Sequence, residues 1–432
     1  MISLNLLGQE DTEFLVDNSS VKSVRSQDVI DLADRSGSTH LSALTVASQA
    51  LVQTLPQANC SVCVCVPVRD EAATLEQTLI ALLNQTDLSG KALEPTSYEV
   101  ILLANNCSDH SAAIAKQFSA QYPSFVLHVV ERVLPAVEAH IGRVRQLLMD
   151  EAYQRLRSLD RPQGIIASTD GDSQVSPTWI AATRWEIEQG VDAVGGRIIT
   201  DRPSRHALEA HTRRCFLQEV GYRSLIAELE SYLDPDPHDP FPRHYQHYGA
   251  SLAVTAETYA QAGGLPPVRT AEDEAFYQAL LRVNARFRHS PLVQVTTSAR
   301  QTGRSPVGLA NQLNVWANQG SQPFWVEPAG AIATRFQARC RLRQLWQRLL
   351  NGHQLLQPEV APLAHTLGID ATWLMLELTE RHTLGSLLAQ VEQRQQAEGQ
   401  WRQRWALVDI KQAIGALRHF LEPLRQRAAI KI

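Results

Sequence analysis

The sequence predicts an α/β fold with a mostly parallel sheet, helices on both faces of that sheet, and an all-helical C-terminal extension. Three observations support this expectation. Short apolar runs alternate with segments of helical periodicity between residues 59 and 305, an order typical of parallel sheets. Polar clusters follow three of these apolar runs. Residues 306–432 are rich in Leu, Gln and Arg and show helical spacing.

Strands and helices of the sheet region are expected in strict alternation, over residues 62–66, 73–84, 100–103, 111–122, 125–130, 142–157 and 164–168. The first helix illustrates the reasoning, because Leu75, Leu79 and Leu82 recur on one face. The strands are expected where short apolar runs stop at polar or turn residues.

The chain divides into three stretches. Residues 1–58 are polar and weakly patterned, with one candidate helix over residues 42–55. Residues 59–305 hold the α/β pattern, and residues 306–432 form the helical extension. Its helices are expected over residues 335–350, 371–379, 384–398 and 401–421.

Length and composition are those of a globular protein. The chain has 432 residues, of which 44% are hydrophobic and 20% charged, enough for a large core in one or two domains. A net charge of -5 indicates no nucleic-acid partner. No apolar run reaches the roughly 18 residues of a membrane-spanning helix, and the first ten residues do not resemble a secretory signal.

Cysteine usage favours a cytoplasmic location. Six cysteines are too few for a disulfide framework in a chain of this length, which fits a reducing compartment. Cys60, Cys63 and Cys65 have the spacing of a metal cluster. However, Cys63 and Cys65 alternate with three valines, so we expect them to be small apolar residues of a buried strand.

Asp170-Gly171-Asp172 directly follows the strand expected over residues 164–168. Two carboxylates at the exposed end of a strand can face a divalent cation and the diphosphate that it carries. Mg²⁺-type ions take one or two carboxylates and leave their other positions to water and phosphate. A solvated Asp-Gly turn is the alternative.

Polar residues also follow the first and second strands. Pro67 is expected to end the first strand; Arg69 can then reach a phosphate, and Glu71 can accept from a ribose hydroxyl or a base edge. Asn105 follows the second strand and can pair with a nucleobase edge. The alternatives are an acidic helix start for Glu71 and a plain strand-to-helix turn for Asn105. Ligands of such sheets bind beyond the carboxyl ends of the strands, where all three clusters fall.

The ordered motifs resemble those of the family-two glycosyltransferases. Residues 62–83 resemble their opening strand with its proline and acidic pair, and residues 165–179 resemble their D-x-D segment. The remaining matches, in family order, are residues 99–118, Gly142-Arg-Val-Arg145, residues 247–253, Gly263-Gly264, Ala271-Glu272-Asp273-Glu274 and Thr297-Ser-Ala-Arg300 with Arg304 and Gly308. Members commonly carry an acidic residue after the second strand, where this chain has Ala104 and Asn105, so the base preference stays open.

This resemblance implies a GT-A fold and sugar transfer from a UDP- or GDP-sugar to a hydroxyl of an unidentified acceptor. It implies that Asp172 holds a divalent cation, Mn²⁺ or Mg²⁺, which offsets charge on the leaving diphosphate. Asp170 is expected to hold the ribose or a metal-bound water. The other residues expected to contact the nucleotide sugar are Pro67, Arg69, Glu71, Asn105, Arg145, Arg300 and Arg304.

Asp273 is the candidate general base, carried over from its motif position, with Glu272 in support. A carboxylate within about 3 Å of the acceptor hydroxyl can take its proton during attack. Direct attack with the base on the opposite face predicts inversion at the sugar carbon. An acidic helix start is the alternative for these residues.

Three other activities share part of the pattern. A retaining GT-A transferase acting on a small phosphorylated or glycerate-type acceptor would differ in product stereochemistry. A nucleotidyltransferase would share the sheet and the metal, but no Gly-rich loop with a following Arg and Lys lies near the first strand. A non-catalytic nucleotide-sugar-binding protein would show no metal-dependent hydrolysis, and the intact acidic motifs disfavour it.

Two flanking features complete the expectations. Residues 234–242 contain four prolines, which forbid regular structure, and this loop would suit a lid over the acceptor. Nearby, His247 is expected at the surface or against the acceptor rather than on a metal. The helix from Arg335 to Leu350 is basic and amphipathic; it can contact a membrane peripherally, but packing on its own domain is favoured.

Overall fold

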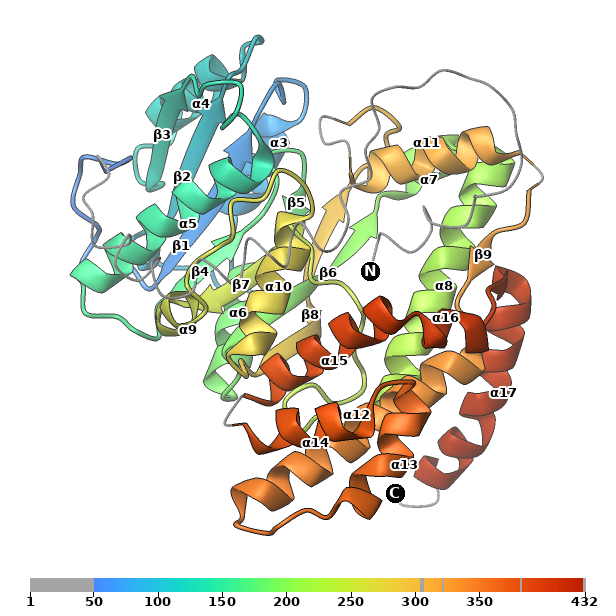
Figure 1. Ribbon diagram of the computed structural model, residues 1–432. Helices are drawn as coiled ribbons and strands as arrows, with labels where there is room; N and C mark the ends of the chain where they lie inside the picture. Colours follow the sequence, from blue (N-terminus) through green and yellow to red (C-terminus); the bar gives the residue numbers. More distant parts are fainter. Residues whose placement is uncertain (1–49, 304–306, 321, 381–382, 430–432) are drawn as a thin grey trace.

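Eight strands form one mixed sheet, which the computed structural model shows together with its flanking helices (Figure 1). The structure describes residues 50–303, 307–320, 322–380 and 383–429. In chain order the strands of this sheet are β1 (Val62–Val68), β2 (Tyr98–Asn105), β3 (Leu127–Arg132), β4 (Ile165–Ser168), β5 (Gln174–Val175), β6 (Ala193–Thr200), β7 (Leu252–Thr255) and β8 (Phe287–Thr297).

The sheet is mostly parallel, which confirms the predicted fold class. Its strand order is β3-β2-β1-β4-β7-β6-β8-β5. Strand β7 is antiparallel to both of its neighbours, β5 is antiparallel to β8, and the other pairings are parallel. Strands β1, β2 and β4 therefore end at the same edge of the sheet, and the polar segments that follow them meet there.

Helices cover both faces of the sheet (Figure 1). The helices of this region are α3 (Leu75–Leu83), α4 (Ser111–Gln121), α5 (Ile141–Ser158), α6 (Trp179–Glu188), α7 (Arg202–Ala207), α8 (Ala210–Leu233), α9 (Ala256–Gln261) and α10 (Glu272–Arg282), with short 3-10 turns η2 (Pro95–Ser97) and η3 (Gly249–Ser251). The valines of β1 pack with α3, α4 and α6 on one face, and its cysteines pack with α5, α9 and α10 on the other. Burial on both faces explains the continuous apolar run of this strand.

Cys63 and Cys65 lie in β1 and are fully buried, which confirms the strand interpretation. The sulfurs of Cys60 and Cys63 lie within 4.8 Å of a carboxylate oxygen of Glu99. That carboxylate already has a counter-charge, because Arg155 Nε and Nη2 donate to it at 2.6 and 2.8 Å. The cluster is therefore a buried ion pair with neighbouring thiols.

Two local expectations differ from the structure. Pro67 does not end β1, which continues to Val68. Strand β4 pairs with β1 only as far as Cys65. Beyond that point β1 has only β2 as a neighbour, so it tolerates Pro67, which has no backbone N–H to donate. The helix expected over residues 42–55 begins outside the described residues, and its described part, from residue 50, is not helical.

The C-terminal region is helical, as predicted. Its helices are α11 (Leu309–Gln319), α12 (Ala329–Leu350), α13 (Gln357–Leu367), α14 (Ala371–Thr379), α15 (Leu384–Glu398), α16 (Gln400–Arg404) and α17 (Ile410–Ala429). The expectation of an all-helical extension did not include β9 (Trp325–Val326) and β10 (Val408–Asp409), which pair antiparallel. Strands of two residues are too short to show a hydrophobic period.

Helix α8 connects the sheet region with the C-terminal helices. Its residues Cys215, Tyr222 and Leu229 share one hydrophobic core with apolar residues of α11, α12 and α17. Figure 1 shows α8 alongside these three helices. The boundary expected near residue 305 therefore runs through a shared core.

Helix α12 contains the basic amphipathic segment that begins at Arg335. Its apolar residues Phe336, Leu342 and Leu345 are at most 5% exposed. Its arginines make ion pairs, among them Arg339 with Glu230 at 3.0 Å. The protein itself therefore covers the apolar face of this helix, as the packing alternative predicts. The helix gives no support to a membrane contact. Among the described residues, no helix has the length and apolar character needed to span a membrane.

Strand β8 fixes the proline-rich loop at residues 234–242. Asp239 accepts hydrogen bonds from Arg288 Nη1 and from the backbone N–H of His289, both at 3.0 Å. Arg288 also donates to the carbonyls of Pro240 and Pro242, at 2.6 and 3.0 Å. These bonds hold the loop in place, so it does not fit the role of a moving lid.

Candidate active site

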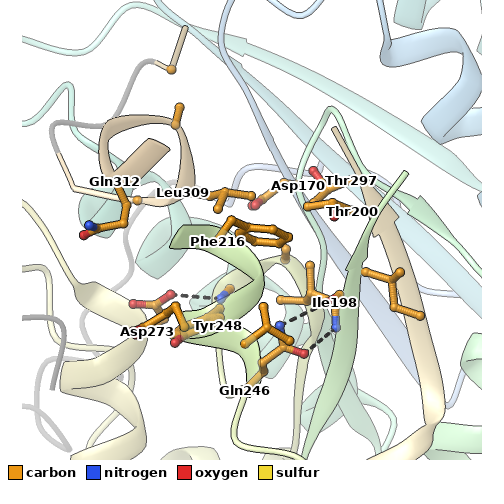
Figure 2. Close-up of a pocket in the computed structure, with 18 of the residues that line it drawn as sticks. Asp170, Ile198, Thr200, Phe216, Gln246, Tyr248, Asp273, Thr297, Leu309 and Gln312 are labelled. Atoms are coloured by element: carbon orange, nitrogen blue, oxygen red, sulfur yellow. Dashed lines mark hydrogen bonds between the residues drawn. The ribbon is translucent and has the colours of Figure 1, made fainter. Parts of the chain in front are cut away.

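A cavity of about 1600 Å³ lies at the carboxyl ends of β1, β2 and β4 and extends along α8. It is larger than the roughly 300–1,000 Å³ of a typical small-molecule site. Every predicted site residue that the structure describes lines this cavity: Pro67, Arg69, Glu71, Asn105, Arg145, Asp170, Asp172, Glu272, Asp273 and Arg300. Arg304 lies outside the described residues. Figure 2 shows part of the lining, including Asp170, Asp273 and Phe216 of α8.

Gly171 brings the D-x-D turn against the end of β1. A Cβ at this position would lie 3.0 Å from Val68 Cγ2 and 3.2 Å from the carbonyl oxygen of Pro67. Thr78 Oγ1 of α3 also donates to the Gly171 carbonyl at 3.1 Å. The absence of a side chain permits this approach, which places the flanking carboxylates beside the loop that carries Glu71.

Arg300 connects carboxylates from two loops. Its guanidinium donates to both oxygens of Glu71, at 2.9 and 3.0 Å, and Nη2 lies 2.7 Å from Asp172 Oδ2. Burial and the nearby carboxylate of Asp170 raise the pKa of Asp172 to about 6, against the opposing effect of Arg300. Negative charge is thus concentrated at this end of the cavity.

Arg145 is buried and connects the D-x-D turn with α10. Nη2 donates to Asp170 Oδ1 at 2.8 Å, and Nε donates to Glu272 Oε1 at 3.2 Å. Nη1 donates to the carbonyl of Gly249 at 2.9 Å and to Ser168 Oγ. A Cβ at Gly249 would lie 2.5 Å from Arg145 Cζ, so glycine is needed for this approach. Acceptors of the protein itself surround the guanidinium.

The two acidic residues at the start of α10 differ in environment. Glu272 is 6% exposed and faces Arg145. Burial, reinforced by Asp273 and opposed by Arg145, raises the pKa of Glu272 to about 7. Asp273 is half-buried, and its Oδ2 accepts from the backbone N–H of Gly249 at 3.1 Å (Figure 2). Of the two carboxylates, that of Asp273 is more accessible from the cavity.

Three non-glycine residues at the site loops have left-handed backbones: Asp70, Asn106 and Ala271, with φ of 54°, 49° and 54°. Such conformations cost about 1–3 kcal/mol each and persist where the surroundings enforce them. For Asp70 the surroundings are visible, because its Oδ1 accepts from the backbone N–H groups of Ser108 and Asp109, at 2.6 and 3.2 Å. These bonds lower the pKa of Asp70, and the bond from Ser108 has the largest effect. They also connect the loop after β1 to the loop after β2.

Asn105 ends β2, lines the cavity and is 3% exposed. Its Oδ1 is buried and accepts no hydrogen bond from the described residues. An amide oxygen in this state carries a desolvation penalty of about 1–3 kcal/mol. A ligand N–H at this position would remove that penalty.

His247 differs from the expectation of a surface or acceptor-contacting residue. Its side chain is 15% exposed, and Nε2 lies 2.8 Å from Glu274 Oε2. Its ring stacks on that of Tyr277, with centroids 3.9 Å apart. The pair holds the start of α10 in place, and His247 is not among the residues that line the cavity.

The second wall of the cavity was not predicted from the sequence. It consists of the end of β6, α8, α11 and part of α17, and contains Arg197, Arg214, Phe216 and Trp316. On α8 almost every position from 213 to 225 lines the cavity; the two that do not, Cys215 and Tyr222, lie in the hydrophobic core. The lining therefore has no helical period from which the sequence could have shown it.

The family model described as "Glycosyl transferase family 2" matches residues 63–241, a range that includes β1, the D-x-D turn and α8. Residues 63–241 are thus similar to glycosyltransferase family 2. This confirms the resemblance predicted from the ordered motifs, and the mixed, mostly parallel sheet between helices agrees with the expected GT-A arrangement. The matched range ends before Asp273 and Arg300, so the assignments at those positions rest on geometry.

A curated relative is also described as a glycosyltransferase. Glycosyltransferase AglE of Haloferax volcanii is 24% identical over 192 residues, which cover 42% of this chain and 56% of that protein. The chain thus spans little more than half the length of this relative.

Two solved structures are similar at low identity. The mannosyltransferase PcManGT from Pyrobaculum calidifontis, in complex with GDP-Man and Mn²⁺, is 14% identical with a TM-score of 0.39; the match covers 90% of this chain and 97% of that one. S. aureus TarS 1-349 in complex with UDP is 13% identical with a TM-score of 0.39, covering 79% of this chain and 91% of that one. These scores are too low to transfer a site.

Proposed function

We propose that this protein transfers a sugar from a UDP- or GDP-sugar to a hydroxyl of an acceptor. The observation that carries the proposal is the convergence of Glu71, Asp170, Asp172 and Arg300 at one end of the cavity that Asp273 also lines. The similarity of residues 63–241 to glycosyltransferase family 2 supports the same class of reaction.

The end of the cavity near β1 suits a nucleoside diphosphate. Arg300 and Arg69 supply positive charge for the diphosphate, and Glu71 can accept a hydrogen bond from a ribose hydroxyl. Asn105 adds an amide with an unsatisfied buried oxygen, which suits a base edge that offers an N–H. Uracil and guanine both have such an edge, so we leave both nucleotides in the proposal.

The carboxylates of the D-x-D turn fit a hard divalent cation, Mn²⁺ or Mg²⁺. Asp172 lines the cavity, and its Oδ2 faces a positive group in the structure, Arg300 Nη2 at 2.7 Å. Such ions bind through one or two carboxylates and complete their shell with water and phosphate oxygens. Asp172 would be the ligand, and Asp170 would hold the ribose or a water. When bound, the cation stabilises negative charge on the departing diphosphate.

We assign the general base to Asp273. Its Oδ2 accepts from the N–H of Gly249 at 3.1 Å and its Oδ1 from the N–H of Glu274 at 2.9 Å, so its orientation is fixed. A fixed carboxylate that borders the cavity can take the proton of the acceptor hydroxyl while the new C–O bond forms. Direct attack of this kind gives inversion at the sugar carbon.

Arg145 acts as a positioning residue in this scheme. It holds Asp170 at 2.8 Å and Glu272 at 3.2 Å, and so links the donor end of the cavity to the start of α10. Because protein acceptors surround its guanidinium, we no longer assign it to the diphosphate. Glu272 supports Asp273 by anchoring α10 to Arg145.

Isothermal titration with UDP- and GDP-sugars, with and without Mn²⁺, tests the proposal. We expect one nucleotide class to bind in a Mn²⁺-dependent way, and Asp172→Ala to lose that dependence while its thermal unfolding stays cooperative. Asp192→Ala is the matched control, because Asp192 pairs with Arg286 and does not line the cavity. Wild-type protein that binds neither nucleotide sugar would contradict the proposal.

Product stereochemistry separates the inverting scheme from retaining transfer to a small phosphorylated acceptor. The anomeric configuration of the glycosidic bond in the product can be read by ¹H NMR. Inversion is expected from the Asp273 assignment, whereas a retained configuration would leave sugar transfer standing and remove Asp273 as the base.

A further inference from the structure

The cavity has room for more than the donor. Its volume of about 1600 Å³ exceeds the roughly 300–1,000 Å³ typical of a single small-molecule site. The carboxylates assigned to the donor lie at the end near β1. The remaining part, which we name the α8 half, is lined by residues 197–200, by α8, by α11 and by part of α17.

The α8 half has an excess of positive charge. Six arginines line it: Arg197, Arg205, Arg213, Arg214, Arg223 and Arg418. The carboxylates on this wall are those of Glu219 and Glu228, and each already has a partner, Arg223 and Arg425 respectively. Arg197 and Arg214 are exposed and have no hydrogen bond or ion pair within the described part of the chain. A concave surface of one sign attracts a ligand of the opposite sign.

Apolar side chains lie beside these arginines. Phe216 and Val220 line the same half and are partly exposed, and Leu217 of α8 is 51% exposed there. Phe241, on the fixed proline-rich loop, borders the cavity and is 52% exposed. Large apolar residues left open to a cavity indicate a ligand with an apolar part.

The charged and apolar groups lie near the assigned base. The guanidinium of Arg223 is 6.0 Å from the ring centroid of Tyr245. On β6, Ile198 follows Arg197 and its backbone exchanges hydrogen bonds with the side chain of Gln246, at 2.8 and 3.0 Å (Figure 2). Gly249, three residues further along the chain, donates to Asp273 at 3.1 Å. An anion held by Arg197 would therefore lie on the side of the cavity that Asp273 borders.

We propose that the acceptor carries a phosphate or carboxylate group beside an apolar body, and that Arg197 and Arg214 bind this anionic group. The inference deepens the proposed function and rests on it. The reacting hydroxyl would belong to the same molecule as the anion, and the apolar residues of α8 and α11 would hold its body. A neutral sugar acceptor would leave these arginines unused, and an anion without an apolar body would leave the open apolar residues uncovered.

Isothermal titration of the protein with n-octyl phosphate, in the presence of UDP or GDP and Mn²⁺, tests the inference. Octyl glucoside has the same tail without the charge, and inorganic phosphate has the charge without the tail. We expect octyl phosphate to bind at least about tenfold more tightly than either, because each comparison removes one set of contacts. Equal binding of octyl phosphate and octyl glucoside would overturn the role of the anion. Equal binding of octyl phosphate and inorganic phosphate would overturn the apolar body.

Arg197→Gln combined with Arg214→Gln should weaken octyl phosphate about tenfold or more and leave octyl glucoside unchanged. Arg402→Gln combined with Arg427→Gln removes the same charge from exposed positions that do not line the cavity, and should change neither. If both double variants weaken octyl phosphate equally, only net charge matters and the site is wrong. Nucleotide-sugar binding is measured in parallel; its absence from wild-type protein would contradict the proposed function, whereas loss of octyl phosphate alone contradicts only this inference.

Flotation with phosphatidic acid vesicles, compared with phosphatidylcholine vesicles, distinguishes the two sources of such an anion. Binding to the phosphatidic acid vesicles that depends on Arg197 and Arg214 indicates a membrane lipid. Binding of octyl phosphate without vesicle binding indicates a soluble acceptor. Both results support the proposed chemistry, whereas failure of both probes to bind wild-type protein would overturn it.

Discussion

Arg300 Nη2 lies 2.7 Å from Asp172 Oδ2 and 2.9 Å from Glu71 Oε1. A guanidinium thus stands beside the carboxylate that we assign to a metal. Removing a positive group from a cluster of carboxylates makes that cluster more attractive to a cation. The same arginine that serves the diphosphate therefore competes with the cation when no nucleotide is bound.

Arg300→Gln should bind Mn²⁺ alone about tenfold more tightly than wild type, because Asp172 and Glu71 lose their counter-charge. Isothermal titration without nucleotide measures this. Arg286→Gln, which breaks the ion pair with Asp192 away from the cavity, should leave Mn²⁺ affinity unchanged. Unchanged or weaker Mn²⁺ binding by Arg300→Gln would show that the two cations do not compete.

Asp273→Asn should bind the nucleotide sugar with near-normal affinity and lose about 10²–10⁴ in kcat, because asparagine keeps the shape and cannot accept the proton. Donor titration and turnover with a validated acceptor measure the two effects. Full turnover would place the base elsewhere, and Glu272 would be the next candidate, since burial raises its pKa to about 7. A loss of donor affinity instead would make Asp273 a binding group.

Glu99→Gln should destabilise the protein by up to about 3–5 kcal/mol, because the buried Arg155 loses its closest counter-charge and keeps that of Glu151, 3.9 Å away. Arg155 donates to both oxygens of Glu99, whose side chain is fully buried. Urea unfolding at pH 7 measures the change. Glu94→Gln, at an exposed position, should stay within about 0.5 kcal/mol of wild type.

The same carboxylate predicts a pH dependence. Burial alone would raise the pKa of Glu99, but hydrogen bonds from Arg155 and His128 lower it to about 2, from an ordinary 4.5. A lowered folded-state pKa gives stability that is present above the unfolded value and is lost as pH falls toward the folded value. Wild-type stability should therefore fall between about pH 4.5 and pH 2, and Glu99→Gln should show a smaller fall. Equal slopes in the two proteins would contradict this assignment.

A chain ending at residue 305 should not fold stably. It would expose Cys215, Tyr222 and Leu229 of α8, which are buried against the C-terminal helices. Burial of each such side chain contributes on the order of 1.5–3 kcal/mol. Soluble yield and the cooperativity of thermal unfolding measure the effect. A soluble, cooperatively folded and fully active product would show that the C-terminal helices have no role in the fold or the acceptor side.

The predicted strands and the motif residues were found from local patterns. The elements from β1 to β4 lie where the sequence predicts them, because a strand buried on both faces must be apolar along its length. The polar residues after these strands share one cavity because parallel strands end at one edge. The end of β1 was predicted at Pro67, one residue too early. A proline is tolerated inside this strand because β4 stops pairing with β1 at Cys65, which the sequence does not show.

The contacts among these residues could not be predicted. Arg145 was expected to clamp a diphosphate, but tertiary contacts give its guanidinium four protein acceptors. Arg300 and Glu71 were expected to serve a ligand separately, yet they pair with each other. A sequence shows which groups can make an ion pair, whereas distance and burial decide which pairs form.

The sequence by itself determined the sheet, the edge at which its ligand groups gather, and the residue types available there, because these follow from hydrophobic period and strand direction. Only the tertiary structure decided the second wall of the cavity. That wall joins β6 with α8, α11 and α17, and these three helices are far apart in the chain and meet through a shared hydrophobic core. Hydrophobic burial is not directional, so an apolar helix face shows that it needs a partner but not which partner it finds.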